Sequence, residues 1–349
     1  MNKVCVSGVK RPYEVLIGKG ILKELPGVLK ANTNAQKIVV ITDDNVDKYY
    51  SKEVMSMLCE SGYEAIKFVF SHGELHKTIE TVSDILEFMA QNNITRSDAI
   101  VALGGGITGD VSGFVAASYL RGIAFVQVPT TFLAAIDSSV GGKTGVNLKA
   151  GKNLAGAFYQ PRAVLCDTET FKTLPEENFK EGIAEAIKYG IICDEGLFDT
   201  LKEGKNWDLE AVIERCVSIK AEIVAEDEFD TGKRQLLNLG HTIGHAIEKC
   251  SDFTITHGIA VGIGMAMVSK ASDALGWTDD VIYPKVIEAL KNNELMTEYD
   301  VRKEDLLSVM AKDKKRIGGS ITLVVPKNIG ESVLKKIPVE ELKEVIVNC

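Results

Sequence analysis

Short hydrophobic runs alternate with amphipathic stretches along the first 170 residues of the chain. The runs are rich in β-branched residues, which is typical of buried strands. In the stretches between them, such as 47–62 and 78–93, apolar residues recur at intervals of three and four, as in helices packed on a sheet. This alternation predicts an α/β domain built on a parallel sheet. The predicted strands are KIVVIT (37–42), EAIKFVF (64–70), DAIVAL (98–103), AFVQVP (124–129) and AVLCD (163–167).

After about residue 170 the pattern changes to long helical periodicity with few strand signals. One late strand pair is expected near ITLVVP (321–326). The sequence therefore predicts two domains, an α/β domain over residues 1–170 and a mainly α-helical domain over residues 171–349. The helical stretches are 181–193, 209–228, 238–250 and 257–276.

Composition and charge narrow the classes of protein to which the chain can belong. Its 349 residues exceed one typical domain, and 45% of them are hydrophobic, enough for a sizeable core. No stretch approaches the roughly 18 unbroken apolar residues of a membrane span, and no signal peptide is visible, so we expect a cytoplasmic protein. The net charge of −9 argues against nucleic-acid binding, so anionic ligands must meet locally placed lysines and arginines.

A glycine-rich turn follows the predicted strand 98–103 and leads into a helical stretch. Gly104, Gly106 and Gly109 meet the Gly-x-Gly-x-x-Gly spacing, in which the backbone can approach a pyrophosphate at a helix N-terminus. A tight strand-to-helix turn without a ligand has the same pattern, so both interpretations stay open. The turn also departs from the usual dinucleotide fingerprint, because it follows a later strand and no acidic residue ends the next strand.

A carboxylate that binds the ribose would therefore come from another strand. The earlier strand 37–42 is followed by Asp43, Asp44 and Asn45, at the carboxyl edge of the predicted sheet. The alternative is that these side chains only cap the helix that follows. The residue pattern favours neither interpretation.

Three of the five histidines fall close together and form the sharpest chemical signal in the chain. His241 and His245 are four residues apart in a helical stretch, so they share a helix face and suit a metal site, or one ligand beside one acid–base group. His257 stands at the expected start of the next helix. The alternative is a set of core or capping histidines, since HxxxH without an intervening Glu is not a metalloprotease motif.

A carboxylate should complete such a metal site, because a catalytic Zn²⁺ typically takes three protein ligands and leaves one position open. Glu185 is the candidate, but Glu181 lies four residues earlier on the same helix face. Spacing alone does not separate the two.

Two glycine-rich segments carry lysines that could bind a phosphate. They are 137–145, which contains Lys143, and 151–153, which contains Lys152 and Asn153. We expect both segments to be loops, in which solvated lysines without a ligand are the alternative. Further along the chain, Arg234 precedes His241, and its planar guanidinium could pair with a carboxylate.

Taken together in their order along the chain, these segments resemble the 3-dehydroquinate synthase family, and the resemblance extends over essentially the full length of the chain. The block from Gln127 to Asn147 and the segment LNLGHTIGHAIE are highly specific, whereas the glycine turn is not. Two positions depart from the family pattern: Ile259 stands where Glu is common, and His72 where a small residue is common. The other matching segments are SHGELHKT, GGGITGD, GKNLAGAFYQP, FKTLP, GIAEAIKYG and HGIAVG.

The resemblance implies an NAD site, Rossmann-like in character, in the first domain. It also implies one divalent metal ion, zinc or cobalt, bound by Glu185, His241 and His257. It thereby selects Glu185 over Glu181. The residues implied to bind NAD are Asp43, Asn45, Glu74, Lys77, the turn with Gly105, Gly106, Ile107 and Asp110, and also Thr130, Thr131, Lys152, Phe171, Thr173 and Leu174.

The resemblance further implies a phosphorylated sugar-acid substrate and a homodimer, in which Arg121 reaches the partner's site. The residues implied to bind substrate are Arg121, Asp137, Lys143, Asn153, Lys188, Lys220, Arg234, Asn238, His245 and Lys314. Of these, a catalytic role is implied for Lys143, Lys188, Arg234, Asn238 and His245. His245 and Lys143 would orient the phosphate, and Arg234 and Lys220 would pair with the carboxylate.

The implied activity converts 3-deoxy-D-arabino-heptulosonate 7-phosphate to 3-dehydroquinate and phosphate, the second step of the shikimate pathway. NAD⁺ oxidises C5, phosphate leaves by β-elimination, the hydride returns, and the ring opens and closes again by an aldol step. The metal acts as a Lewis acid on the reacting oxygen, and a closed site retains the reduced cofactor. The alternatives are another sugar-phosphate cyclase, such as 2-deoxy-scyllo-inosose synthase, and a polyol dehydrogenase of similar fold.

Overall fold

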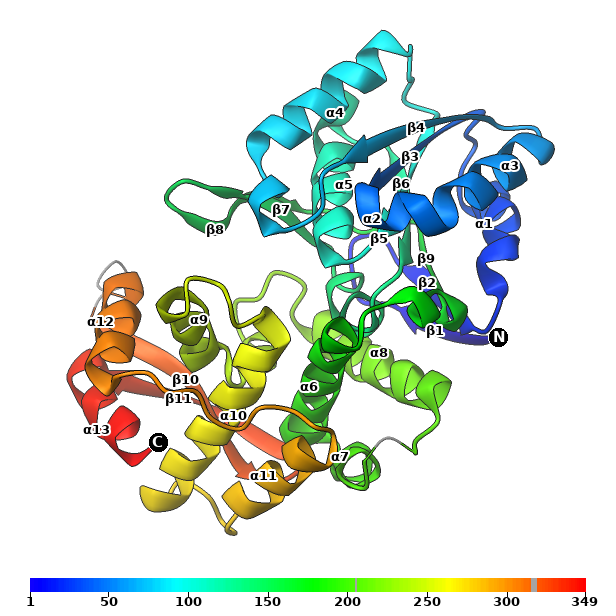
Figure 1. Cartoon of the computed structure of the whole chain (residues 1–349). Helices are drawn as coiled ribbons and strands as arrows, with labels where there is room; N and C mark the ends of the chain where they lie inside the picture. The colour runs from blue at the N-terminus through cyan, green and yellow to red at the C-terminus, as the bar shows by residue number, and fades with distance from the viewer. Residues whose placement is uncertain (205, 315–318) are drawn as a thin grey trace. The chain divides into compact units, whose positions relative to one another are not determined.

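Contacts divide the chain into two compact units (Figure 1). The computed structural model describes residues 1–204, 206–314 and 319–349, without the side chains of 311–314. The N-terminal unit consists of Met1–Pro175 and Leu209–Phe229, and the C-terminal unit of Glu176–Asp208 and Asp230–Cys349. Within the described residues, no helix combines the length and the apolar character needed to cross a membrane.

A seven-stranded sheet forms the centre of the N-terminal unit, in the order β1-β2-β9-β6-β5-β3-β4. All neighbours pair in parallel except β1 and β2, which are antiparallel. The five strands predicted from the sequence are confirmed, whereas β1 and β2 were not predicted. The strands are β1 (Asn2–Val6), β2 (Tyr13–Gly18), β3 (Lys37–Asp43), β4 (Glu64–Phe70), β5 (Ala99–Gly104), β6 (Ala124–Pro129) and β9 (Ala163–Asp167).

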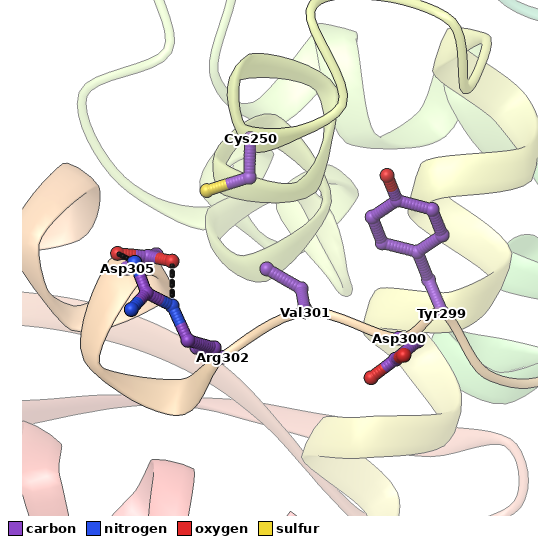
Figure 2. A pocket seen from close by; sticks show the side chains of 6 residues that line it. All are labelled: Cys250, Tyr299, Asp300, Val301, Arg302 and Asp305. Carbon is purple, nitrogen blue, oxygen red and sulfur yellow. Dashed lines mark hydrogen bonds and ion pairs between the residues drawn. The ribbon is translucent and has the colours of Figure 1, made fainter.

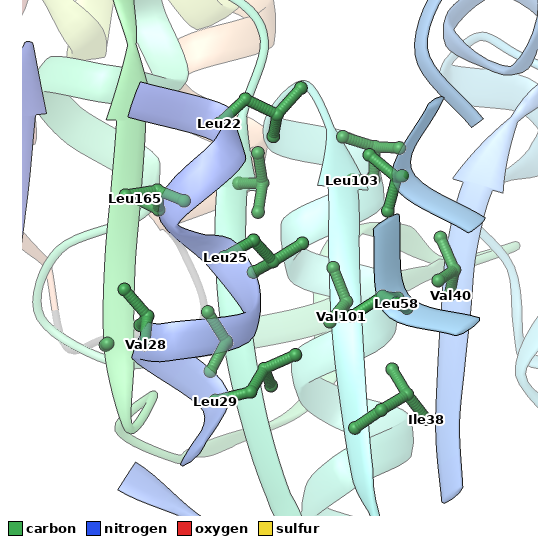
Figure 3. Close-up of a cluster of buried hydrophobic side chains, with 14 of the residues drawn as sticks. Leu22, Leu25, Val28, Leu29, Ile38, Val40, Leu58, Val101, Leu103 and Leu165 are labelled. Carbon is green, nitrogen blue, oxygen red and sulfur yellow. The ribbon is translucent and has the colours of Figure 1, made fainter. Parts of the chain in front are cut away.

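Helices cover both faces of this sheet, because side chains alternate between the two faces along each strand. Ile38 and Val40 of β3 pack in one buried cluster, and Val39 and Ile41 pack in the other. Figure 3 shows the first cluster, in which leucines of α1 and α3 lie against the strands. The covering helices are α1 (Leu25–Asn32) and α3 (Lys52–Glu60) on one face, and α4 (Ile79–Gln91) and α5 (Gly106–Ser118) on the other.

A separate antiparallel hairpin, β7 (Lys143–Leu148) and β8 (Gly151–Phe158), carries the lysines that the sequence placed in loops. That prediction was wrong. The glycines serve strand pairing: a Cβ on Gly156 would lie 2.1 Å from the carbonyl oxygen of Thr144, and one on Gly145 would lie 2.6 Å from that of Ala155. Glycine has a low propensity for strands, so the sequence alone does not predict a strand at these positions. Only the paired structure shows that the close approach of the two strands requires glycine.

The C-terminal unit is mainly helical, and the α/β plus helical fold class is confirmed. The expected late strand pair is present as a hairpin of β10 (Ser320–Asn328) and β11 (Glu331–Pro338). The helices are α6 (Glu176–Cys193), α7 (Glu195–Lys202), α9 (His241–Cys250), α10 (His257–Ala274), α11 (Tyr283–Asn292), α12 (Lys303–Lys314) and α13 (Leu342–Asn348).

One helix departs from the domain limits 1–170 and 171–349 expected from the sequence. Helix α8 (Leu209–Glu226) belongs to the N-terminal unit, because it packs on β1 and β2. Glu214 of α8 accepts a hydrogen bond of 2.6 Å from the Asn2 side chain, and Gly8 leaves room for Ala225. The periodicity of α8 shows that one of its faces is buried, but not which surface buries it.

Candidate active site

Three helices of the C-terminal unit bring together Glu185 from α6, His241 from α9 and His257 from α10. Glycines allow the helices to pack closely. A Cβ on Gly264 of α10 would lie 2.2 Å from the carbonyl oxygen of Gly240, just before α9. A Cβ on Gly258 would lie 2.5 Å from the Cα of Glu181 on α6. The backbone contacts thus set the positions from which the three side chains converge.

The three side chains have the geometry of a metal site. Nε2 of His241 and Nε2 of His257 each lie 3.7 Å from Oε1 of Glu185. Ligand atoms about 2 Å from a tetrahedral ion lie roughly 3.3 Å apart, so a small contraction would suffice. Glu185 is fully buried, and its Oε1 accepts no hydrogen bond from any residue that the structure describes. Such an oxygen is costly unless a cation binds it, so the residues fit a divalent metal ion.

The second nitrogen of each imidazole has its own partner. Nδ1 of His241 lies 3.1 Å from the carbonyl oxygen of Leu239, and Nδ1 of His257 lies 3.4 Å from Oε2 of Glu248. Partners of this kind orient metal-binding histidines and leave Nε2 for the ion. Glu248 was not predicted from the sequence, although it stands three residues after His245 and seven after His241, on the same face of α9.

The two histidines differ in their pKa. Burial, with the nearby Lys188 ammonium, holds the pKa of His241 well below its usual value, which favours the neutral form that binds a metal. Burial also acts to lower the pKa of His257, but the hydrogen bond to Glu248 and the charges of Glu185 and Glu248 outweigh it and raise the pKa.

Glu181 and Glu185, which spacing left equivalent, have different surroundings. Oε2 of Glu181 accepts a hydrogen bond of 3.1 Å from the backbone N–H of Gly258, in the first turn of α10. Thr256, the residue before that helix, makes no side-chain cap. Burial raises the pKa of Glu181, although the N–H bond and the His257 charge oppose this. Glu181 therefore caps α10 from α6, and only Glu185 joins the histidine group.

Two other predicted residues of the C-terminal unit, Lys188 and His245, lie beside this group. Lys188 donates a hydrogen bond to Oε2 of Glu185, and both side chains are buried. The centre of the His245 ring lies 5.5 Å from the centre of the His241 ring and 5.7 Å from that of the His257 ring. Arg234, buried, and Asn238, exposed, lie on the 3-10 helix Lys233–Asn238 that precedes α9. Lys314 ends α12, and its side chain lies outside the described part of the structure.

The residues predicted to bind NAD gather at one edge of the N-terminal sheet. The strands β9, β6, β5, β3 and β4 are consecutive neighbours in the sheet, and ligands of parallel sheets bind outside such carboxyl ends. Lys152 alone lies elsewhere, on β8. Asp43 ends β3 and Asn45 comes after it, Glu74 and Lys77 follow β4, Gly105 to Asp110 follow β5, Thr130 and Thr131 follow β6, and Phe171, Thr173 and Leu174 follow β9.

The structure also supports the simpler interpretations of two of these motifs. Asp43 caps the helix that follows, since its Oδ1 accepts hydrogen bonds from the N–H groups of Asn45 (3.0 Å) and Val46 (3.1 Å). In the glycine turn, a Cβ on Gly104 would lie 2.5 Å from Oγ1 of Thr108. Packing therefore requires glycine there with or without a ligand, and NAD binding remains a prediction for both motifs.

Lys77 joins three polar segments of the N-terminal unit. Its buried Nζ donates to Oδ2 of Asp110 (2.5 Å) and to Oδ1 of Asn153 (2.6 Å). Burial raises the pKa of Asp110, although Lys77 acts against this. The side-chain amide of Asn147, which was not predicted as a site residue, donates a hydrogen bond of 2.7 Å to Oε1 of Glu74. The start of α5, the segment after β4 and the hairpin β7–β8 thus form one network.

Two predicted substrate residues meet at another point of this unit. Lys220 on α8 donates a hydrogen bond of 2.6 Å to the backbone carbonyl oxygen of Asp137 and also pairs with the Asp137 carboxylate. Lys143 and Arg121 are exposed. Leu120 and Arg121 both have left-handed backbone conformations, with φ of 49° and 66°. Backbone conformations of this kind are strained for residues other than glycine.

The two departures from the family pattern have local structural explanations. Ile259 is buried within α10, as an apolar helix residue should be. Nδ1 of His72 lies 2.7 Å from Oδ1 of Asp44, next to the β3 edge, and lowers the pKa of this exposed carboxyl group. Neither position belongs to the Glu185 group.

A pocket of the C-terminal unit contains none of the predicted residues (Figure 2). Among the described residues that line it, the only cationic side chain is that of Arg302, which is already paired with Asp305, with N–O distances of 2.8 and 3.0 Å. The pocket therefore gives no reason to move the candidate site. It is lined by Cys250, Tyr299, Asp300, Val301, Arg302 and Asp305.

Solved structures of known function share this fold. A structure of 2-deoxy-scyllo-inosose synthase, complexed with carbaglucose-6-phosphate, NAD⁺ and Co²⁺, has a TM-score of 0.90 with the chain. The two are 28% identical, and the match covers 99% of each. The chain thus has the fold of the sugar-phosphate cyclases.

Sequence comparison identifies the family within this class. Two family models match, 3-dehydroquinate synthase N-terminal over residues 67–181 and 3-dehydroquinate synthase C-terminal over residues 182–316. A 3-dehydroquinate synthase of Streptococcus suis (strain 05ZYH33) is 40% identical over 98% of this chain and 99% of its own length. One of Clostridium acetobutylicum is 43% identical over 94% of each. The chain belongs to the 3-dehydroquinate synthase family.

Proposed function

We propose that the chain converts 3-deoxy-D-arabino-heptulosonate 7-phosphate to 3-dehydroquinate and phosphate, as a lyase that uses NAD⁺ and one divalent metal ion. The observation that carries the proposal is the group Glu185, His241 and His257, with a buried carboxylate oxygen facing two imidazole nitrogens, in a chain of this family. The full-length relatives of 40–43% identity support the particular reaction.

Glu185, His241 and His257 would hold zinc or cobalt. When bound there, the ion would supply Lewis-acid polarisation of the substrate oxygen whose carbon is oxidised and later reduced. Nδ1 of His241 contacts Leu239, and Nδ1 of His257 contacts Glu248, so Nε2 of each ring remains for the ion.

NAD would bind at the carboxyl edge of the N-terminal sheet, where the predicted residues gather. The amides at the start of α5 face this edge and suit a pyrophosphate, and the network around Lys77 holds the surrounding segments together. The bound NAD⁺ in the related inosose synthase supports this choice of cofactor.

The substrate anions would be bound by locally placed cationic side chains, since the chain as a whole carries a net charge of −9. Lys143 and His245 would orient the phosphate, and Arg234 and Lys220 would pair with the carboxylate. Asp137, Asn153, Lys188, Asn238 and Lys314 complete the proposed substrate set. A homodimer in which Arg121 enters the partner's site is part of the proposal.

The second candidate function is that of the inosose synthase, because its structure matches the fold so closely. Its identity of 28% is lower than that of the 3-dehydroquinate synthases, and Arg234 suits a substrate with a carboxylate. Iron-containing alcohol dehydrogenases are only 16% identical, and their likeness concerns the fold alone.

The test is phosphate release from the heptulosonate phosphate at substoichiometric NAD⁺. We expect many turnovers per NAD⁺, no accumulation of NADH, and loss of activity on chelation that added Zn²⁺ or Co²⁺ restores. Glucose 6-phosphate, which lacks the carboxylate, serves as the matched substrate. Turnover only with glucose 6-phosphate would establish the cyclase alternative, and steady NADH formation would establish a dehydrogenase.

A further inference from the structure

One imidazole, that of His257, has a carboxylate near each of its two nitrogens. Nε2 lies 3.7 Å from Oε1 of Glu185, and Nδ1 lies 3.4 Å from Oε2 of Glu248. The side chain of Glu248 is 5% exposed and that of Glu185 is fully buried. Both carboxylates therefore interact with the ring in surroundings where electrostatic interactions are strong.

The two carboxylates impose different demands on the ring. An ionised carboxylate can only accept hydrogen bonds, so the nitrogen that faces Glu248 in a bond must carry the hydrogen. The other nitrogen then keeps its lone pair for a metal ion. Among the ligands, His241 shows the same division, with a backbone carbonyl at Nδ1 and Glu185 near Nε2.

We propose that Glu248 is a positioning residue, which holds His257 as the Nδ1–H tautomer and directs Nε2 toward Glu185. The inference rests on the metal site of the proposed function and extends it to a residue outside the ligand set. Carboxylate partners of metal-bound histidines fix the orientation of the ring and make the ligand more basic. Their removal costs about 10- to 100-fold in metal affinity.

A different arrangement, in which Glu248 itself binds the metal, is less well supported. The ligand atoms of His245, Glu248 and His257 also lie within 4.8 Å of one another, and this set shares His257 with the first. Glu248 already contacts Nδ1 of His257, whereas Oε1 of Glu185 accepts no hydrogen bond among the described residues. The oxygen that lacks a partner is the better ligand, and the oxygen that has one is the better orienting group.

The test compares Glu248→Gln with Glu288→Gln in the full-length protein. Glutamine keeps the shape of the side chain and removes its charge, and Glu288 is an exposed glutamate on α11. We would measure Zn²⁺ and Co²⁺ dissociation constants by competition with a chromogenic chelator, and the urea unfolding of both metal-free proteins. The visible spectrum of the Co²⁺ protein reports the ligand geometry.

We expect metal binding about 10- to 100-fold weaker in Glu248→Gln, with an altered Co²⁺ spectrum, and no change in Glu288→Gln. An affinity within twofold of the parent would overturn the proposal, whether or not the metal-free variant is less stable. An equal loss of affinity in His245→Gln would also overturn it, because Glu248 would then belong to the ligand set. His241→Ala tests the metal site itself: if this variant still binds metal tightly, the proposed ligand set fails, independently of Glu248.

Discussion

Asp98 shows how a single buried carboxylate holds two strand ends of the N-terminal unit in place. Its Oδ1 accepts a hydrogen bond of 3.0 Å from the N–H of Lys37, where β3 begins. Its Oδ2 accepts bonds of 2.7 Å from both the N–H and the hydroxyl of Thr95. Burial acts to raise the pKa of Asp98, but these hydrogen bonds outweigh it and lower the pKa.

A pH-dependent loss of stability is therefore expected in Asp98→Asn. A carboxyl group with a lowered folded-state pKa contributes stability above its unfolded pKa, and this contribution is lost as the pH falls through the folded-state value. At pH 7 the variant should lose about 1–3 kcal/mol of unfolding free energy in urea titrations. The difference from the parent should shrink below about pH 4, the usual range of Asp. A difference that is constant from pH 7 to pH 3 would contradict this account.

At the same scale, the sequence predicted the clustering of the histidines better than their surroundings. His241, His245 and His257 are recognisable because histidines are few and their spacing is helical. The separate roles of Glu181 and Glu185 depend on the packing of α6 against α10, which spacing does not contain. Glu248 was missed because its partner His257 lies on the next helix.

At the scale of elements, glycine contacts set how closely α9 and α10 approach. Gly264 and Gly262 stand two residues apart in α10 and form a matched pair. A Cβ on Gly264 meets the Gly240 carbonyl oxygen at 2.2 Å, whereas one on Gly262 meets only ordinary contacts, at 3.6 Å and beyond. The same substitution should therefore have opposite effects at the two positions.

We expect Gly264→Ala to lower the unfolding free energy by about 3 kcal/mol or more, because backbone must move to admit the methyl group. Metal affinity should fall with it, since α9 carries His241 and α10 carries His257. Gly262→Ala should be neutral or stabilising by up to about 1 kcal/mol, through helix propensity. Denaturant titrations and metal competition on both variants check this, and equal stabilities would refute the role of the close contact.

Elements were predictable where hydrophobicity and propensity agree. The run Ile38–Ile41 is fully buried and was recognised as a strand. The hairpin β7–β8 was taken for loops because Gly145 and Gly156, which allow its strands to pair, weaken the strand pattern. The packing of α8 on the N-terminal unit could not be predicted from the sequence either, because the apolar face of an amphipathic helix can pack on many different surfaces.

For the whole molecule, the two units should respond to different ligands. The metal candidates Glu185, His241 and His257 all belong to the C-terminal unit, and the NAD candidates all belong to the N-terminal unit. A ligand at 100 times its dissociation constant stabilises the folded state by about 2.7 kcal/mol. That gain should first slow hydrogen exchange in the segments that contact the ligand.

Hydrogen exchange of the full chain can test this division. Zn²⁺ should slow exchange most in α6, α9 and α10, and NAD⁺ most in the turns after β3 and β5. With His241→Ala as the control, the effect of Zn²⁺ should vanish and that of NAD⁺ should persist. Slowing by NAD⁺ that is greatest in α9, without change at residues 104–110, would contradict the predicted cofactor site.

The return of α8 to the N-terminal unit has a consequence for synthesis of the chain. The polypeptide leaves this unit after Pro175 and re-enters it at Leu209, so β1 and β2 meet the helix that packs on them only after part of the other unit has been made. At about 5–20 residues per second, synthesis of the intervening residues 176–208 delays α8 by a time on the order of seconds. Until α8 is made, it cannot cover the surface of β1 and β2 on which it packs, so we expect chaperones to bind the nascent chain there.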